Sequence, residues 1–213
     1  RKLVLAAIAA LALAAAAPAL AAEPTPFGGA TISNGTATLV SDTSNTATTD
    51  NFSGVRLALP TGLTLAQITQ LAADFNVTDD DCGGGSPRFV ISYGATENVT
   101  INFGPSPNFT GCAAGWLSTG NLVGTSDKLR VDTSQVGGSV DSTWAQALSL
   151  VGNRTISSIS LDVDGSWKMA DLEQTVLVRN IKLNNETFLV PSTPTTGKVN
   201  PTTACKAQKA ALG

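Results

Sequence analysis

The feature that most constrains the fold of this chain is a series of short segments in which apolar residues occupy every second position. Residues 89–93, "FVISY", form one such segment, and residues 99–103, "VTINF", form the next. The same pattern occurs in residues 55–59, 75–77 and 159–163. Alternation with period two is typical of strands that are buried on one face and solvated on the other. About ten such strands separated by turn residues predict an all-β fold, an antiparallel β-sandwich or jelly roll.

One strand changes its parity along its length. In the segment "QTVLVRNIKL", Val176 and Val178 share one face, whereas Ile181 and Leu183 fall on the other. A β-bulge adds one residue to a strand and so shifts all later side chains by one position. We therefore expect a bulge near Arg179-Asn180 that returns all four apolar residues to the core.

Turn signals separate several of these strands. Asn34-Gly35 is the pair that a two-residue type I′ hairpin needs, because both positions take positive φ. Asp164-Gly165, before Ser166, is interpreted in the same way, as a hairpin turn after the strand that ends near Val163.

Two short helices are expected within this pattern. Thr64 and Thr143 each begin the sequence T-x-x-Q, a capping box that marks a helix N-terminus. Each should start a helix of two or three turns. In the second, Trp144, Leu148 and Val151 form one apolar stripe, so Trp144 is expected in the core rather than on a ligand surface.

The N-terminal residues predict secretion. Residues 1–21 contain Arg1 and Lys2, an apolar run that ends before Pro18, and an A-x-A triplet, which is the pattern of a cleaved signal peptide. The run is shorter than the ~18 residues of a membrane-spanning helix, so no membrane span is expected after the signal is removed. The protein is thus expected to be secreted and extracellular, with a mature chain that begins near Ala22.

The remainder divides into three parts. Residues 22–190 are expected to form the β-sandwich domain. Residues 191–203 are rich in proline and threonine and have no apolar period, which is typical of a linker. Residues 204–213 are interpreted as the start of a C-terminal helical module that the sequence cuts short.

The charge and the absence of histidine limit the function. Removal of residues 1–21 leaves 11 basic against 16 acidic residues, a net charge of −5, which argues against nucleic acid or an anionic membrane as a partner.

The chain has no histidine, so serine–histidine and cysteine–histidine catalysis are excluded. Paired carboxylates of a glycosidase stay open, but Glu97, Glu173 and Glu186 lie in polar surroundings typical of solvated charges. We expect no enzyme activity.

The segment "VTDDDCGGGSPRF" is the most site-like part of the sequence. In an oxidising compartment Cys82 and Cys112 are expected to form a disulfide that joins the outer ends of the hairpin between them. A phosphate-binding loop is rejected because the glycines lead into a strand. On an extended backbone only Asp79 and Asp81 point to the same side, which makes them candidate calcium ligands. A solvated turn held by the disulfide, with no cofactor, is the favoured alternative.

Several segments carry a resemblance to a group of secreted bacterial proteins that have no established activity. They are "FNVTDDDCGGGSPRF", "NFTGCAAGWLSTGNLVG", "LRVDTSQVGG", "STWAQALSLVG" and "SISLDVDGSW", with "EQTVLVRNIKLN" last. The last segment resembles the closing strand of galactose-binding-like jelly rolls. Such domains often bind carbohydrate, so the resemblance implies a carbohydrate-binding module.

The tail "ACKAQKAALG" resembles the opening of a C-terminal pattern in bacterial secreted proteins, CKxQ[KR]AA followed by NAFGKCV. In that pattern the first cysteine is expected to bond the second, which this sequence lacks. Cys205 is therefore expected to be unpaired and far from Cys82 and Cys112.

Two functions stay open. The first is a secreted, non-catalytic binding module for an extracellular polysaccharide or cell-wall glycan, with Trp116, Trp167 and Tyr93 as candidate ligand-binding residues. Trp116 and Trp167 lie in Gly/Ser-rich segments and are expected on a shared exposed surface. The second is a secreted structural or cell-surface domain with no small-molecule ligand. Few aromatic residues, 5% of the chain, argue against the first function.

Overall fold

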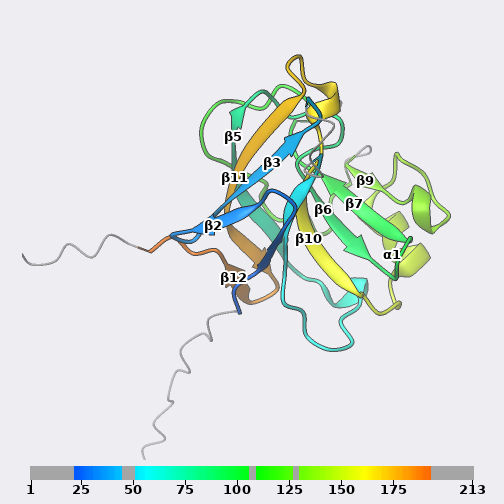
Figure 1. The fold of residues 1–213 in the computed structure, drawn as a ribbon. Helices are drawn as coiled ribbons and strands as arrows, with labels where there is room; N and C mark the ends of the chain where they lie inside the picture. Colours follow the sequence, from blue (N-terminus) through cyan, green and yellow to red (C-terminus); the bar gives the residue numbers. More distant parts are fainter. Residues whose placement is uncertain (1–21, 45–50, 106–108, 127–129, 193–213) are drawn as a thin grey trace, which may run out of the picture.

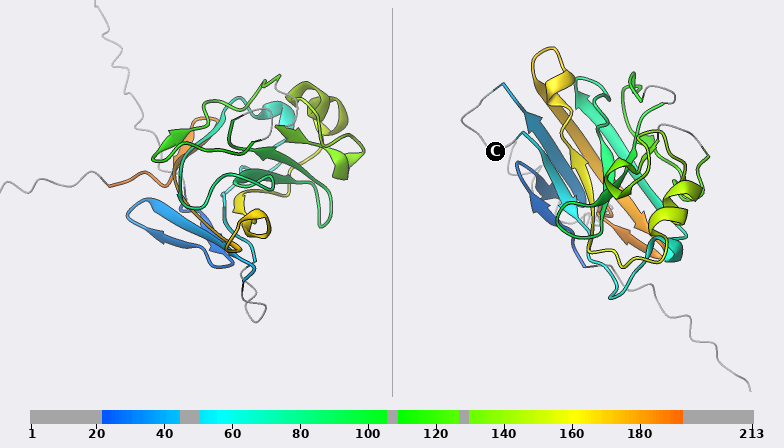
Figure 2. Two further views of the ribbon diagram at one scale, coloured as in Figure 1. Left: turned by 90° about the horizontal axis from the view of Figure 1, so that it is seen from above. Right: turned by 90° about the vertical axis from the view of Figure 1, so that its right-hand side faces the viewer.

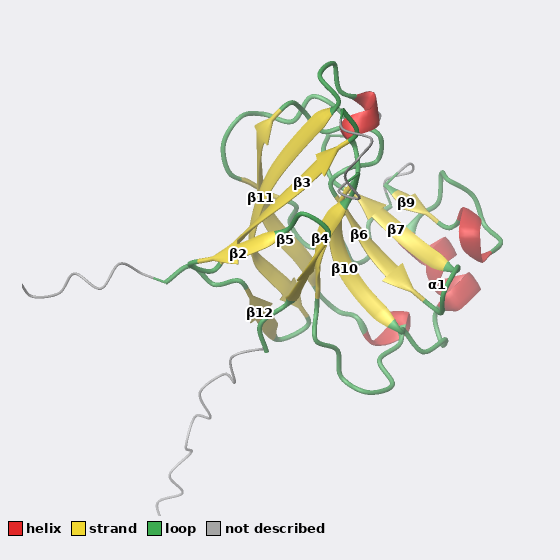
Figure 3. Cartoon of the chain, viewed as in Figure 1, coloured by secondary structure: helices red, strands yellow, loops and turns green. Residues whose placement is uncertain are grey.

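The computed structural model describes residues 22–44, 51–105, 109–126 and 130–192. Two antiparallel β-sheets lie face to face (Figures 1 and 3), so the all-β sandwich is confirmed. All described strands fall within residues 22–190. The proposed signal peptide, most of the linker and Cys205 lie outside the described residues. No helix in the described ranges is both long and apolar enough to cross a membrane.

The first sheet, sheet A, has six strands. Their spatial order is β1 (Thr25–Phe27), β4 (Ser53–Arg56), β10 (Ser158–Val163), β6 (Arg88–Ser92), β7 (Asn98–Asn102) and β9 (Val131–Asp132). The adjacent strands β6 and β7 form the hairpin that the two period-two segments predict.

The second sheet, sheet B, contains the longest strands. Their order is β2 (Thr31–Ser33), β3 (Thr36–Asp42), β11 (Glu173–Leu183), β5 (Leu71–Asp79) and β8 (Leu117–Ser118), and β12 (Glu186–Phe188) also pairs with β11. Strands β11 and β5 run side by side through the centre of this sheet (Figure 2). Strands β2 and β3 confirm the two-residue hairpin at Asn34-Gly35, where φ is 50° and 68°.

The core lies between the sheets and is built from alternate residues of each strand. Ile91, Ile101 and Val176 are completely buried, as expected from the period-two pattern. The ring of Phe103 lies 5.2 Å from that of Phe75 in sheet B and 5.3 Å from that of Phe89 in sheet A. These aromatic contacts join the two layers.

The expected β-bulge in β11 is present. The register of β11 against β5 shifts between Arg179 and Lys182, and Asn180 takes a left-handed φ of 49°. Because of this extra residue, apolar side chains on both sides of the bulge reach the core, and their exposure is 0% for Val178 and Ile181.

The two capping boxes have different outcomes. Thr143 begins α1 (Trp144–Val151), its Oγ1 accepts from the Gln146 amide at 3.3 Å, and Trp144 is buried as expected. The other box starts only a short 3-10 helix, η1 (Leu65–Gln67), so the expected longer helix is wrong there. The Asn184 Oδ1 accepts the backbone N–H of Thr69 at 2.7 Å, which replaces the next helical hydrogen bond, and β5 begins directly afterwards.

The turn after Val163 is not a hairpin, which corrects the interpretation of Asp164-Gly165. Strand β10 belongs to sheet A and the following strand β11 belongs to sheet B. The chain crosses between them through the 3-10 helix η3 (Ser166–Lys168). The buried Ser166 hydroxyl accepts a hydrogen bond from the Ser41 hydroxyl at 2.8 Å, which holds this crossover against β3. One further 3-10 helix, η2 (Ser134–Val136), follows β9.

Candidate functional site

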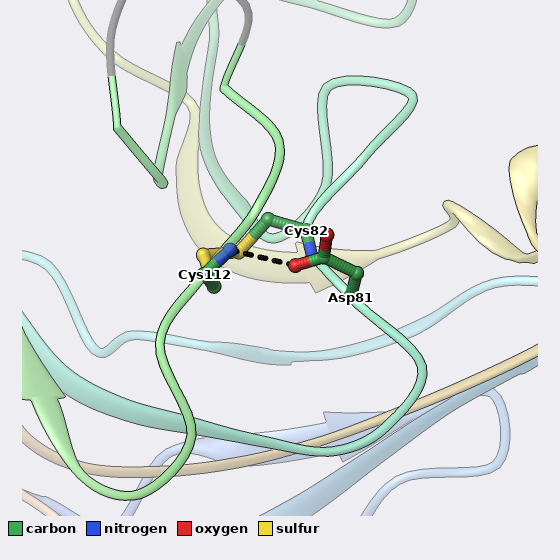
Figure 4. A group of neighbouring side chains, drawn as sticks. All are labelled: Asp81, Cys82 and Cys112. Carbon is green, nitrogen blue, oxygen red and sulfur yellow. Dashed lines mark hydrogen bonds between the residues drawn. A yellow bond between two sulfur atoms is a disulfide. The ribbon is translucent and has the colours of Figure 1, made fainter.

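The acidic, glycine-rich segment is a structural junction. Cys82 and Cys112 form the expected disulfide, with their Cα atoms 5.5 Å apart. The Asp81 carboxylate accepts the backbone N–H groups of Cys82, Gly111 and Cys112 at 2.7, 2.8 and 2.6 Å. Figure 4 shows Asp81 beside the two cysteines. Three hydrogen bonds to one carboxylate fix the loop that carries Cys112. Asp81 therefore has a structural role in this position.

The extended backbone on which the pairing of Asp79 with Asp81 was expected is interrupted at Asp80. Asp80 has a left-handed φ of 60°, which breaks the alternation of side chains. The carboxylates that come together are instead those of Asp79, Asp80 and Asp171, whose oxygen atoms lie within 4.8 Å of one another. A hydrogen bond to Asp171 raises the pKa of Asp80 to about 6, and the same bond lowers the pKa of Asp171. If a cation binds here, these three residues would hold it.

A buried glutamine, which no sequence motif indicates, holds the residues on both sides of the three consecutive glycines. The Gln174 Nε2 donates to the Asp81 carbonyl at 2.6 Å. Its Oε1 accepts from the Ser86 hydroxyl at 2.7 Å and from the Gly165 amide at 3.2 Å. Gln174 is completely buried, so its amide satisfies polar groups that have no access to water.

The three candidate ligand-binding aromatic residues lie in different environments. Tyr93 is in the core with 8% exposure and the Arg154 guanidinium over its ring, so it is not part of an exposed surface. Trp167 is 56% exposed in η3, beside Lys168 and Gly84. Trp116 is 37% exposed, immediately before β8, and stacks on Arg179 of sheet B. The tryptophans are thus both exposed, but on different elements.

Sheet B has a hollow on its outer face, which we call the outer cleft. Its volume is about 390 Å³, at the small end of the range for small-molecule sites. Ala72, which pairs with Lys182, contributes only a methyl group to its lining. The cleft is lined by Gln70, Ala72, Ala73, Asp74, Ser118, Gly120, Asn121, Asn180, Lys182 and Thr187.

The β-bulge assembles one wall of the outer cleft. Because the extra residue is inserted here, neighbouring Arg179 and Asn180 are both partly exposed while the residues that flank them are buried. The Asn180 Nδ2 donates to the Asp74 carboxylate at 2.8 Å, and the Arg179 Nε lies 4.0 Å from the same carboxylate. Arg179 in turn lies 3.8 Å from the centre of the Trp116 ring. A continuous set of contacts therefore joins the cleft to an exposed indole.

Two other hollows are less suitable as ligand sites. One, of about 360 Å³, lies on the other side of β8 between Phe75, Leu117 and Gly104-Pro105, next to residues that the structure does not describe. The other, of about 580 Å³, is a shallow space beside Gly83, Gly84 and Met169 at the disulfide junction.

The outer cleft offers both donors and acceptors of hydrogen bonds. Its polar groups are amides, hydroxyls, one carboxylate and one ammonium group, and the carboxylate is held by Asn180. Glu97, one of the three glutamates considered as glycosidase carboxylates, does not line the cleft and forms a bidentate ion pair with Arg154. The sequence did not identify Asp74, Asn180 or Lys182 as site residues. The only available signal was the parity change that marks the bulge.

Comparison with known proteins gives no relative for this chain: no family model, no curated protein and no solved structure matches it.

Proposed function

We propose that this chain is a secreted, non-catalytic module that binds carbohydrate in the outer cleft, with Trp116 as its aromatic contact. The observation that carries the proposal is the connection between a polar cleft and an exposed indole through Arg179 and Asp74. The signal-like N-terminus and the resemblance to galactose-binding-like domains support the same function. The β-sandwich is a fold that is often non-catalytic.

The chemistry of the outer cleft matches that of a sugar. Sugar hydroxyls both donate and accept hydrogen bonds, and the amide of Gln70, the hydroxyl of Ser118 and the carboxylate of Asp74 supply both kinds of partner. The C–H face of a pyranose ring is apolar and packs on an aromatic ring. Trp116 is already held in place by Arg179, so less conformational entropy is lost on binding.

One observation favours the second function, a structural or cell-surface domain with no small-molecule ligand. The stack on Arg179 covers one face of the Trp116 ring, which gives this residue a role in the free protein. A purely structural Trp116 would contribute to stability and not to binding.

A glycan array with three proteins distinguishes these functions. We expect the wild-type chain to bind, the Trp116→Ala variant to lose at least tenfold in affinity, and Trp167→Ala to bind like wild type. Trp167 is the matched control because it is exposed but lies in η3. Quenching of tryptophan fluorescence by the bound glycan should disappear in Trp116→Ala alone.

Absence of binding to plant, fungal and bacterial polysaccharides would favour the structural function. If Trp167→Ala lost binding and Trp116→Ala kept it, the binding site would lie at η3 and not at the outer cleft. Binding should persist in a chelator, because Asp79, Asp80 and Asp171 lie at the other end of β5 and outside the cleft.

A further inference from the structure

The outer cleft carries one uncompensated positive charge. Lys182 is exposed on β11 and lines the cleft. In the part of the chain that the structure describes, Lys182 has no carboxylate within ion-pair distance. The one acidic group of the cleft, Asp74, is already engaged by Asn180 and lies near Arg179.

The neighbouring strands do not neutralise this charge. Lys182 pairs with Ala72 on β5 and with Thr187 on β12, neither of which is charged. Glu186 is the nearest acidic residue along β12, but it pairs with Leu183 and so has the opposite parity from Thr187. The lining holds one carboxylate and one ammonium group, and because Arg179 lies beside the Asp74 carboxylate, the charge of Lys182 is left in excess.

Lys182 and Trp116 flank Asp74 along β5. Lys182 lies opposite Ala72, whereas the Trp116 ring stacks on Arg179, which pairs with Asp74. Asp74 is two residues along β5 from Ala72, or about 7 Å at the usual rise of a strand. An oligosaccharide laid along β5 can therefore contact both side chains.

On the basis of the proposed function, we propose that the ligand is an acidic glycan whose uronate carboxylate binds the Lys182 ammonium while a neighbouring ring packs on Trp116. Lys182 is suited to this because an ammonium group is a mobile point charge with three donors. Arg179 is not available for the same role, since its guanidinium lies between Asp74 and the indole.

Polyuronates and their methyl esters test this inference, because esterification removes the charge and keeps the sugar chain. Calorimetry with polygalacturonate and with alginate oligosaccharides should show that at least one acid form binds about tenfold more tightly than its ester. The affinity for the acid form should fall as the salt concentration rises. A uronic acid monomer should bind more weakly than the oligosaccharides, because it has no neighbouring ring to pack on Trp116.

Two lysine variants localise the effect. Lys182→Gln should reduce the affinity for the acid form to that for the ester and leave the affinity for the ester unchanged. Lys168→Gln is the matched control, since it makes the same change in net charge beside Trp167 in η3. It should bind like wild type.

The possible outcomes separate this inference from the proposed function. If neutral glycans bind through Trp116 and the acid forms bind no better than their esters, the inference is wrong and the proposed function stands. The inference is also wrong, and the proposed function also stands, if the ratio of the affinities for acid and ester is the same in wild type and in Lys182→Gln. If no glycan, acidic or neutral, binds the wild-type chain, the proposed function itself fails.

Discussion

At the scale of single residues, the buried carboxyl of Asp162 makes stability depend on pH. Asp162 lies on the outer face of sheet A opposite Gly54 and Arg88, and the Phe27 ring covers Gly54. Its Oδ1 is buried and has no hydrogen-bond partner. Burial raises the pKa of Asp162 to about 6, although Ser160 and Arg88 act in the opposite direction.

Asp162→Asn should therefore change how stability depends on pH. A raised carboxyl pKa means that the folded chain binds more protons than the unfolded chain between about pH 4 and pH 6, so the contribution of Asp162 falls as the pH rises through this window. At pH 8 the variant should be more stable than wild type by roughly 2 to 3 kcal/mol. At pH 3 the difference should vanish.

Urea denaturation of both proteins at several pH values provides the measurement. Asp141→Asn is the control, because Asp141 is exposed in a turn. A constant difference between Asp162→Asn and wild type at all pH values would contradict the assignment of Asp162 as a buried titrating group.

At the scale of an element, the bulge in β11 connects the core to the outer cleft. One inserted residue keeps Ile181 and Leu183 buried and places Arg179 and Asn180 beside the cleft. The left-handed φ of Asn180 is a conformation that asparagine tolerates better than β-branched residues do. The same local geometry thus serves both stability and the proposed site.

Two variants of Asn180 separate these effects. Deletion of Asn180 should shift the remainder of β11 by one position, expose Ile181 and Leu183, and destabilise the fold by more than 4 kcal/mol, on the order of the loss of two buried side chains. Asn180→Gly keeps the positive φ and removes only the contact to Asp74, so it should cost about 1 kcal/mol. Thermal denaturation of the two variants is the measurement. Equal melting temperatures would show that the bulge does not set the register.

At the scale of the whole molecule, one disulfide and one carboxylate tie the long loop after β7 to the end of β5. Cys112 is bonded to Cys82, and Asp81 holds the amides of Gly111 and Cys112. The same loop continues to Trp116 and β8, which pairs with β5 only at Asp74 and Phe75. The junction therefore positions the edge strand that borders the outer cleft.

Replacement of both cysteines by alanine should lower the free energy of unfolding by roughly 3 to 4 kcal/mol, as expected for a loop whose ends are 30 residues apart. Chemical denaturation of the double variant and of wild type under non-reducing conditions gives this difference. The reducing agent provides the control, since it should destabilise wild type by a similar amount and leave the double variant unchanged. A double variant as stable as wild type would mean that Asp81 alone holds the loop.

The sequence by itself determined the elements whose signals are local. Period-two alternation predicted the strands, Asn34-Gly35 predicted a hairpin, and the parity change predicted the bulge at Arg179-Asn180. The disulfide was also predictable, because only Cys82 and Cys112 lie in the sandwich. The strands, the hairpin and the bulge depend on residue types that are neighbours in the chain, whereas the disulfide follows from the number of cysteines in the domain.

Only the tertiary structure decided the features that need distant residues. Asn184 stops the helix at Gln67, the crossover through η3 replaces a hairpin, and Asp171 comes next to Asp79 and the left-handed Asp80. The outer cleft likewise joins residues from β5, β8, β11 and β12. A sequence pattern records which side of a strand a residue faces, but not which strands become neighbours, and that arrangement sets the chemistry of the cleft.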